Sequence, residues 1–228
     1  EDYLGGAVYP QSTLPWYTPW RIIAIGNLKT IAESTLGTDL AKPSNYTNTA
    51  YIKPGKASWS WILLKDNSII FPVQKKYIDF ASKNGIDGVL VEGWNTGWED
   101  WFGKWKEDVF DFLTPYPDYD INDLSAYARS KNVRIIMHHE TSGSVTNYER
   151  YMDRAYALMR KHNMNAVKTG YVGKIIPRGE HHDGQWMVRH YERVAAATAE
   201  NQIMVDMHEP VRPTGLHRTY PNWLANEA

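Results

Sequence analysis

Cysteine is absent from the 228-residue chain. The protein can therefore contain no disulfide, no thiolate metal site and no cysteine nucleophile. Passage through an oxidising compartment is compatible with this absence but is not implied by it.

Long apolar runs and a surplus of charge of one sign are also missing. No run approaches the roughly 18 apolar residues of a membrane-spanning helix, so we expect no membrane insertion. The formal net charge is −1, which gives no reason to expect nucleic acid or an anionic membrane as a partner. The opening residues, Glu1 to Tyr3, lack the basic and apolar regions of a signal peptide. Nothing in these patterns indicates an oligomeric state.

Phenylalanine is scarce, with 5 residues against 10 tryptophans and 15 tyrosines. Tryptophan and tyrosine join an apolar ring to a hydrogen-bonding tip, which suits surfaces that stack on sugar rings. Large barrels also place aromatic side chains under their loops. Composition alone leaves the two interpretations about equally open.

The hydrophobic pattern predicts strands that alternate with helices. The nearly continuous apolar character of the strands is typical of a buried parallel sheet. Residues 57–64 fit either a strand or the start of a helix, and 28–33 fit a helical turn. The predicted strands are 20–26, 88–92, 133–138, 166–169 and 203–207. The predicted helices are 71–84, 121–132 (with Asp120 or Asn122 as N-cap), 146–162, 184–201 and one beginning at 221–228, and a long loop rich in tryptophan covers 93–120.

This order of elements favours an α/β fold, a (β/α)₈ TIM-type barrel with its active site at the carboxyl ends of the strands. A doubly wound sheet is the alternative, but no glycine-rich phosphate-binding fingerprint follows any strand. The strands fall short of eight, and the last predicted helix is unfinished at Ala228. We therefore expect residues 1–228 to be one partial catalytic barrel domain of a longer protein.

Polar side chains stand directly after the predicted strands, at positions that converge in a barrel. Carboxylates, histidines and a lysine in one pocket are costly to desolvate unless they have a task. A single residue of this kind is as often structural, but the whole set favours a function. The set is Glu92, His138, His139, Glu140, Lys168, Thr169, Gly170, His208 and Glu209.

Three chemistries fit this set. Glycoside hydrolysis needs a carboxylic acid and a carboxylate on opposite sides of the sugar, for which Glu140 and Glu209 are candidates. A metal-dependent hydrolase of the amidohydrolase type would use histidines, lysine and a carboxylate around zinc. No His-x-His motif supports it, and the adjacent His138 and His139 would point to opposite faces of a strand. A non-catalytic sugar-binding module would leave the buried carboxylates unexplained.

Two further motifs have less specific interpretations. His181 and His182 form a loop pair that fits a metal site, although a solvated pair is the better interpretation. Trp98, Trp101 and Trp105 have helical spacing, so for some of them packing in the core is favoured over a sugar platform.

Four segments together resemble the catalytic barrel of glycoside hydrolase family 97. Members of that family are α-glucosidases and α-galactosidases of the bacterial periplasm, built from an N-terminal β-sandwich, a (β/α)₈ barrel and a small C-terminal β-domain. The resemblance implies an oligosaccharide substrate and a periplasmic location, with both β-domains absent from this chain. The segments are VEGWNTGWEDWFG (91–103), IIMHHETSG (135–143), AVKTGYVGKIIPRGEHHDGQWMVRHY (166–191) and MHEPVRPTGLHRTYPNWLANEA (207–228).

The resemblance also implies roles for single residues. Glu140 and Glu209 match the glutamates on the base side of the inverting α-glucosidase branch. Glu209 and Glu227 match ligands of a calcium ion, a hard cation that prefers oxygen, and such an ion would tune a neighbouring acid. The positions that match ligands of sugar hydroxyls are Glu92, His138, Lys168 and His208.

Two departures from the family pattern stand out. The family's general acid is a glutamate a few residues beyond Glu227, and a calcium ligand comes from the N-terminal sandwich, so we expect little or no activity from this chain alone.

The retaining α-galactosidase branch carries a nucleophilic aspartate in a Val-Lys-x-Asp pattern, where this chain has Val167 to Gly170. Glycine there favours inversion, with carboxyl groups about 6.5–9.5 Å apart. We therefore expect a calcium-dependent inverting α-glucosidase, with the retaining α-galactosidase or an amidohydrolase-type barrel as alternatives.

Overall fold

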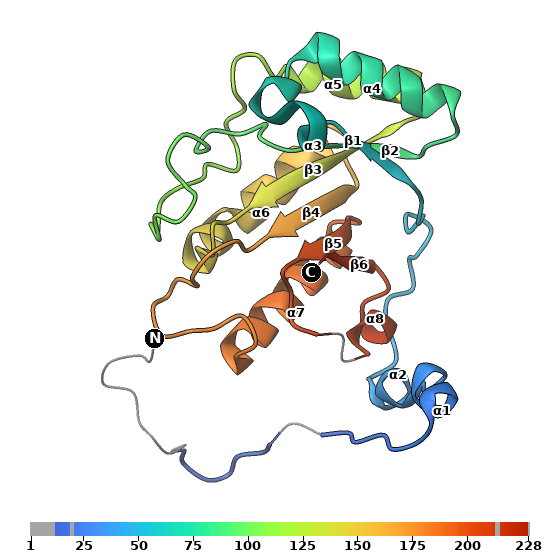
Figure 1. The fold of residues 1–228 in the computed structure, drawn as a ribbon, viewed down its shortest axis with the longest axis vertical. Helices are drawn as coiled ribbons and strands as arrows, with labels where there is room; N and C mark the ends of the chain where they lie inside the picture. The colour runs from blue at the N-terminus through green and yellow to red at the C-terminus, as the bar shows by residue number, and fades with distance from the viewer. Residues whose placement is uncertain (1–11, 19–20, 213–214, 228) are drawn as a thin grey trace.

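The computed structural model describes residues 12–18, 21–212 and 215–227. Within these ranges one parallel sheet runs in chain order and curls into half of a barrel, with helices on its outer face (Figure 1). This arrangement confirms the expected incomplete (β/α)₈ barrel. The strands are β1 (Ala57–Trp59), β2 (Gly88–Val91), β3 (Arg134–Glu140), β4 (Ala166–Gly170), β5 (Met204–His208) and β6 (Trp223–Glu227).

The longer helices connect consecutive strands, as parallel pairing requires. Helix α5 (Ile121–Ser130) begins where expected, because the Asp120 side chain accepts hydrogen bonds from the backbone N–H groups of Asn122 and Asp123. No helix in the described part of the chain is long and apolar enough to cross a bilayer. The helices are α1 (Leu28–Ala32), α2 (Leu36–Leu40), α3 (Trp61–Leu64), α4 (Phe71–Lys83), α5 (Ile121–Ser130), α6 (Val145–Lys161), α7 (Gln185–Glu200) and α8 (Leu216–Thr219), with a 3₁₀ turn, η1, at Lys65–Ser68.

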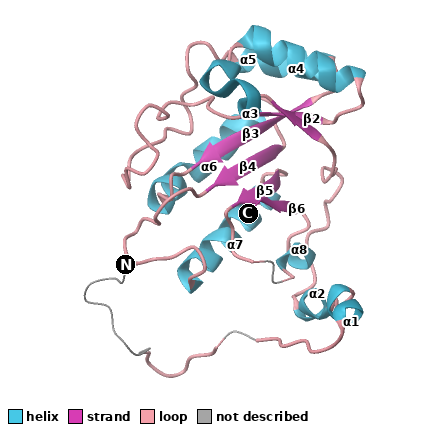
Figure 2. Ribbon diagram, in the orientation of Figure 1, coloured by secondary structure: helices cyan, strands magenta, loops and turns pink. Residues whose placement is uncertain are grey.

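The alternation of side chains along each strand separates the core from the concave face. On β3, Ile135 and Met137 point outward into the hydrophobic core under the helices. His138 and Glu140, two residues apart, point to the opposite, concave face. Long loops follow the carboxyl ends of β2 and β4 (Figure 2), so polar residues at those ends are collected under the loops.

Residues 57–64 satisfy both of the expected alternatives, because β1 is followed at once by α3. The strand expected at 20–26 is wrong for residues 21–26, which form no strand; Trp20 lies outside the described residues. Ile23 and Ile25 are 84% and 89% exposed. An apolar run becomes a strand only when its backbone pairs with a neighbour, and these residues pair with none in the described part of the chain.

The helix expected at 221–228 is also wrong for residues 221–227; Ala228 lies outside the described residues. Residues 223–227 form β6, which pairs in parallel with β5. The Asn222 side chain is fully buried and donates to the carbonyls of Ala195 and Ile203, which holds the entry to the strand in place. Sheet pairing and burial of Trp223 therefore override the helix propensity of this segment.

Candidate active site

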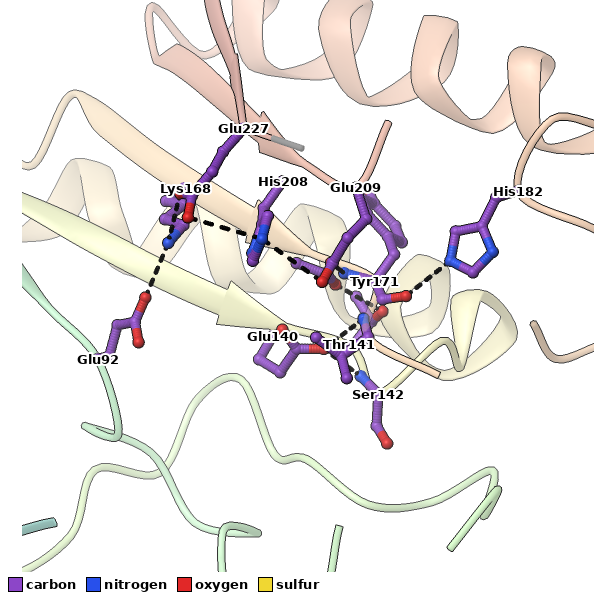
Figure 3. Close-up of polar contacts among 12 residues, drawn as sticks. Glu92, Glu140, Thr141, Ser142, Lys168, Tyr171, His182, His208, Glu209 and Glu227 are labelled. Atoms are coloured by element: carbon purple, nitrogen blue, oxygen red, sulfur yellow. Dashed lines mark hydrogen bonds and ion pairs between the residues drawn. The ribbon is translucent and has the colours of Figure 1, made fainter. Parts of the chain in front are cut away.

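The carboxyl ends of β2 to β5 bring the predicted polar residues together on the concave face. Glu92 directly follows β2, His138 lies on β3, Lys168 on β4 and His208 on β5. His138 and Lys168 are register partners, so their side chains leave the sheet on the same side. Figure 3 shows Glu92, Lys168 and His208 in one cluster, together with Glu227 from β6. The four predicted sugar-binding residues are thus placed in one site.

A buried ammonium group lies at the centre of this cluster. The Lys168 side chain is 3% exposed, and its Nζ lies 3.0 Å from Oε1 of Glu92 and 2.8 Å from Oε2 of Glu227. His138 Nε2 lies 3.5 Å from the same Glu92 oxygen. Two carboxylates therefore compensate the cost of burying the lysine charge.

Burial sets the protonation of this cluster. It raises the pKa of Glu92, although Lys168 acts in the opposite direction. Burial alone would lower the pKa of Lys168, but Glu92 and Glu227 raise it overall, so the ammonium stays charged. Burial, assisted by the Lys168 charge, holds the pKa of His138 well below its usual range. The cluster thus offers a cation, carboxylates and a neutral imidazole to a polar ligand.

The predicted catalytic pair, Glu140 and Glu209, is held by backbone N–H groups. Glu140 Oε1 accepts from the amide of Ser142 at 2.7 Å and from that of Val172 at 3.2 Å. Glu209 Oε2 accepts from the amide of Tyr171 at 2.8 Å. Consecutive amides after β4 thus hold both carboxylates near each other, at one side of the cluster (Figure 3).

The electrostatic environment makes Glu140 a weak acid. Burial raises its pKa to about 8, and the carboxylate of Glu209 adds to the rise, while the amides of Ser142 and Val172 oppose it. A carboxylate with a raised pKa is a stronger proton acceptor once it is ionised. The arrangement therefore suits a general base.

Gly170 leaves the space that the Glu140 carboxyl group occupies. A Cβ atom added to Gly170 would lie 2.0 Å from Glu140 Oε2 and 3.0 Å from Glu140 Cδ. Any side chain at position 170 would therefore displace Glu140. An aspartate at position 170 would therefore require the Glu140 carboxyl group to leave the position it holds here.

Glu209 and Glu227 lie side by side where β5 and β6 end. The Glu209 amide donates to the Glu227 carbonyl at 2.8 Å, and His208 Nε2 lies 3.5 Å and 3.6 Å from one carboxylate oxygen of each. Their carboxylate oxygens are the ligand type that a calcium ion prefers, but they would supply only part of its coordination shell. One Glu227 oxygen is bound to Lys168, and the described residues contain no group of three acidic or histidine side chains arranged around a metal. Further ligands would have to complete the shell.

The remaining histidines do not form a metal centre. His139 points away from His138, as predicted, and its Nδ1 lies 3.0 Å from the Tyr148 hydroxyl behind the sheet. His182 is half-buried, and its Nε2 lies 2.8 Å from the Tyr171 carbonyl oxygen, while His181 is exposed. His182 therefore supports the loop rather than standing solvated with its neighbour. No histidine cluster that could hold zinc occurs in the described ranges.

Comparison with known proteins decides the family. The family model described as "Glycoside hydrolase 97" matches residues 56–228, which is most of the chain and contains every residue of the site above. The chain belongs to glycoside hydrolase family 97. This confirms the resemblance of the four motifs and removes the amidohydrolase alternative.

Several relatives of this family 97 chain have names or solved structures. A family 97 enzyme from Pseudoalteromonas sp. strain K8, solved with acarbose and separately with panose, is 41% identical with a TM-score of 0.80, and the alignment covers 86% of this chain and 33% of that enzyme. A "Retaining alpha-galactosidase" of Bacteroides thetaiotaomicron and a "Probable retaining alpha-galactosidase" of Streptomyces bingchenggensis are each 29% identical, over 98% and 92% of this chain. The chain spans 31% of each of the latter two, or about a third of the length of its relatives.

Most tryptophans discussed from the loop after β2 of this family 97 chain pack in or against the hydrophobic core. Trp94 is fully buried and its indole N–H donates to the His138 carbonyl at 2.7 Å. Trp98 and Trp101 pack on the core, with the Trp98 ring 5.7 Å from the His138 ring. Trp105 instead lies under the guanidinium of Arg178, 4.3 Å away. The expectation that some of the three tryptophans pack in the core is confirmed by Trp98 and Trp101.

Two residues of the site escaped sequence reasoning. The ring of Trp59, at the end of β1, lies 4.7 Å from Lys168 Nζ. Asp206 on β5 is the register partner of Lys168, and burial raises its pKa although the Lys168 charge opposes the rise. Asp206 lies two residues before the predicted site residue His208, so strand alternation is the signal that would have identified it. No predicted site residue on β1 gave a comparable signal for Trp59.

Proposed function

We propose that this barrel is the catalytic centre of an inverting, calcium-dependent α-glucosidase that acts on α-linked oligosaccharides. The observation that carries the proposal is the pairing of Gly170 with Glu140. The glutamate carboxyl group fills the space that a nucleophilic aspartate at position 170 would need. Two carboxylates, Glu140 and Glu209, lie close by and suit the activation of water.

In this proposal Glu140 and Glu209 take a proton from the attacking water. As the water oxygen bonds to the anomeric carbon, the bond from that carbon to the leaving oxygen breaks on the opposite face of the ring. A general acid protonates the leaving oxygen, and the glutamate expected a few residues after Glu227 stays the prediction for it. Configuration at the anomeric carbon is inverted because the reaction has one displacement.

The Lys168 cluster would bind the sugar ring at the scissile bond. Charged Lys168 donates only, ionised Glu92 accepts only, and neutral His138 has one donor and one acceptor. Such a mixed set matches the hydroxyl groups of a sugar, each of which both donates and accepts. The periplasmic location implied by the family resemblance stays a prediction.

The relatives support this proposal unequally. The Pseudoalteromonas enzyme that was solved with the oligosaccharides acarbose and panose is 41% identical. The two relatives named as retaining α-galactosidases are 29% identical. A retaining α-galactosidase is therefore the second candidate.

The full-length gene product, assayed on p-nitrophenyl α-glucoside and α-galactoside, separates the candidates. Proton NMR of the released sugar gives the first anomer before mutarotation. We expect β-glucose to appear first. Release of α-galactose first would establish the retaining alternative and assign the nucleophile to another residue. Release of neither sugar would contradict both candidates.

Calcium removal provides an independent prediction. Glu209 and Glu227 would contribute part of the calcium shell, and the ion would stabilise negative charge beside the reacting centre. We expect a strong chelator to abolish activity of the full-length enzyme and added calcium to restore it. Glu227→Gln should raise the calcium concentration for half-maximal activity by about tenfold or more. The exposed Glu33→Gln serves as control, and activity unchanged by the chelator would reject calcium dependence.

The raised pKa of Glu140 predicts the pH dependence. A general base works only when ionised, so the acidic limb of the kcat/KM profile should rise with pH as Glu140, whose pKa burial raises to about 8, loses its proton. Bound calcium would move this rise to lower pH without reversing it, because a nearby cation favours the ionised form. The measurement is kcat/KM across the range from about pH 5 to about pH 9. A profile that is flat throughout this range would contradict Glu140 as the base.

A further inference from the structure

The residue that links the two proposed base carboxylates is Tyr171, directly after β4. Its backbone N–H donates to Glu209 and that of the next residue, Val172, donates to Glu140. Because these amides are consecutive, the main chain at 171–172 sets how far apart the two carboxylates stand. Any shift of this segment would move both proton acceptors.

The Tyr171 side chain is anchored behind the sheet by a chain of hydrogen bonds. It is fully buried, and its hydroxyl lies 2.9 Å from Nε2 of His190 on α7, which is also fully buried. The other ring nitrogen of His190 lies 2.7 Å from Oε1 of Glu149 on α6. Arg193 binds the same Glu149 oxygen at 2.9 Å and thereby ends the chain at the surface.

Neighbouring groups hold the same segment from other sides. The Tyr191 hydroxyl donates to the Glu209 carbonyl at 3.1 Å, and the Tyr171 and Tyr191 rings meet edge to face, 5.2 Å apart. His182 Nε2 lies 2.8 Å from the Tyr171 carbonyl oxygen, as Figure 3 shows. Tyr171 is thus fixed at its amide, its carbonyl, its ring and its hydroxyl.

We propose that Tyr171, anchored through His190 to Glu149, is a positioning residue for the pair Glu140 and Glu209. The proposal rests on the proposed function, because it assumes that these two carboxylates activate water. A buried hydroxyl and a buried imidazole are costly unless paired. Here their pairing ties the 171–172 amides to two helices, α6 and α7. Such support matters because a catalytic group must be held to within about 0.5 Å of its productive position.

The test compares two buried tyrosines in the full-length enzyme. Tyr171→Phe removes the hydroxyl of the proposed anchor and keeps the ring. Tyr156→Phe is the matched control, because Tyr156 is also fully buried and its hydroxyl lies 3.0 Å from the Tyr148 hydroxyl on the same helix, α6. We expect kcat of the Tyr171 variant to fall about tenfold with KM changed less than about twofold. The control should keep its kcat although its Tm falls similarly.

A kcat of the Tyr171 variant equal to that of the parental enzyme, or an equal loss in both variants, would overturn the proposal. Glu149→Ala, at a half-buried position, gives a second measurement if Tyr171→Phe folds poorly, and should lower kcat in the same direction with KM retained. Unchanged kcat in that variant would likewise count against the anchor. The anomer released by the parental enzyme is determined separately, so failure of the inverting mechanism is distinguished from failure of the positioning role.

Discussion

Glu140→Gln is expected to lower kcat by about 10²- to 10⁴-fold, with KM little changed. Glutamine keeps the shape of glutamate and an oxygen for the amides of Ser142 and Val172, so the loop after β3 should stay in place. It cannot accept the proton of the attacking water. The loss should therefore appear in the chemical step rather than in binding. Steady-state kinetics on an α-glucoside with the full-length enzyme measures both parameters.

The comparison with Glu99→Gln shows whether the effect is specific. Glu99 is an exposed residue in the loop after β2, and its carboxylate accepts a hydrogen bond from the Tyr116 hydroxyl at 2.6 Å. This control should keep kcat within about twofold. If Glu140→Gln retained a kcat within tenfold of the parental value, Glu140 would not be the base, and Glu209 would carry that role alone.

Gly170→Ala is expected to lower kcat by about 10²-fold, because the new methyl group would take the position of the Glu140 carboxyl group. Displacing that carboxyl group would break its bonds to the amides of Ser142 and Val172. The crowding should also reduce the free energy of unfolding by about 1–3 kcal/mol. Kinetics and urea unfolding measure the two effects.

A double-mutant cycle tests the cause of this loss. In a Glu140→Ala background the space next to residue 170 is open. Adding Gly170→Ala to that variant should therefore lower its free energy of unfolding and its residual kcat only slightly. Interacting residues give such non-additive changes, whereas independent residues add. If the two substitutions proved additive, the effect of the alanine would come from the strand backbone and not from contact with Glu140.

The sequence alone was sufficient for much of the barrel and for most members of the site. Strands β2 to β5 and helices α4 to α7 follow from local periodicity, because an element that buries one face repeats its apolar residues with its own period. The cap at Asp120 is equally local. Polar residues after successive parallel strands must meet at one end of a barrel, so Glu92, His138, Lys168 and His208 could be grouped before the fold was known.

Pairing between distant segments could not be derived in this way. Residues 21–26 have an apolar pattern but no partner strand in the described ranges, and residues 223–227 have helix-forming side chains but pair with β5. In both cases the partner decides the structure, since a strand satisfies its backbone groups only through a neighbour. Local pattern carries no information on whether that neighbour is present.

In the site, too, the sequence identified residues, whereas their contacts depended on the tertiary structure. Sequence determined most of the side chains that reach the pocket, although not Trp59 or Asp206, and the glycine at position 170 could be noted as the absence of a nucleophile. Only the tertiary structure decided that Glu140 fills the space beside Gly170, that Glu227 contacts Lys168, and that the amides of residues 171 and 172 hold the two carboxylates. Distances of a few ångströms between strands depend on sheet curvature and helix packing, which arise from the whole chain rather than from any one segment.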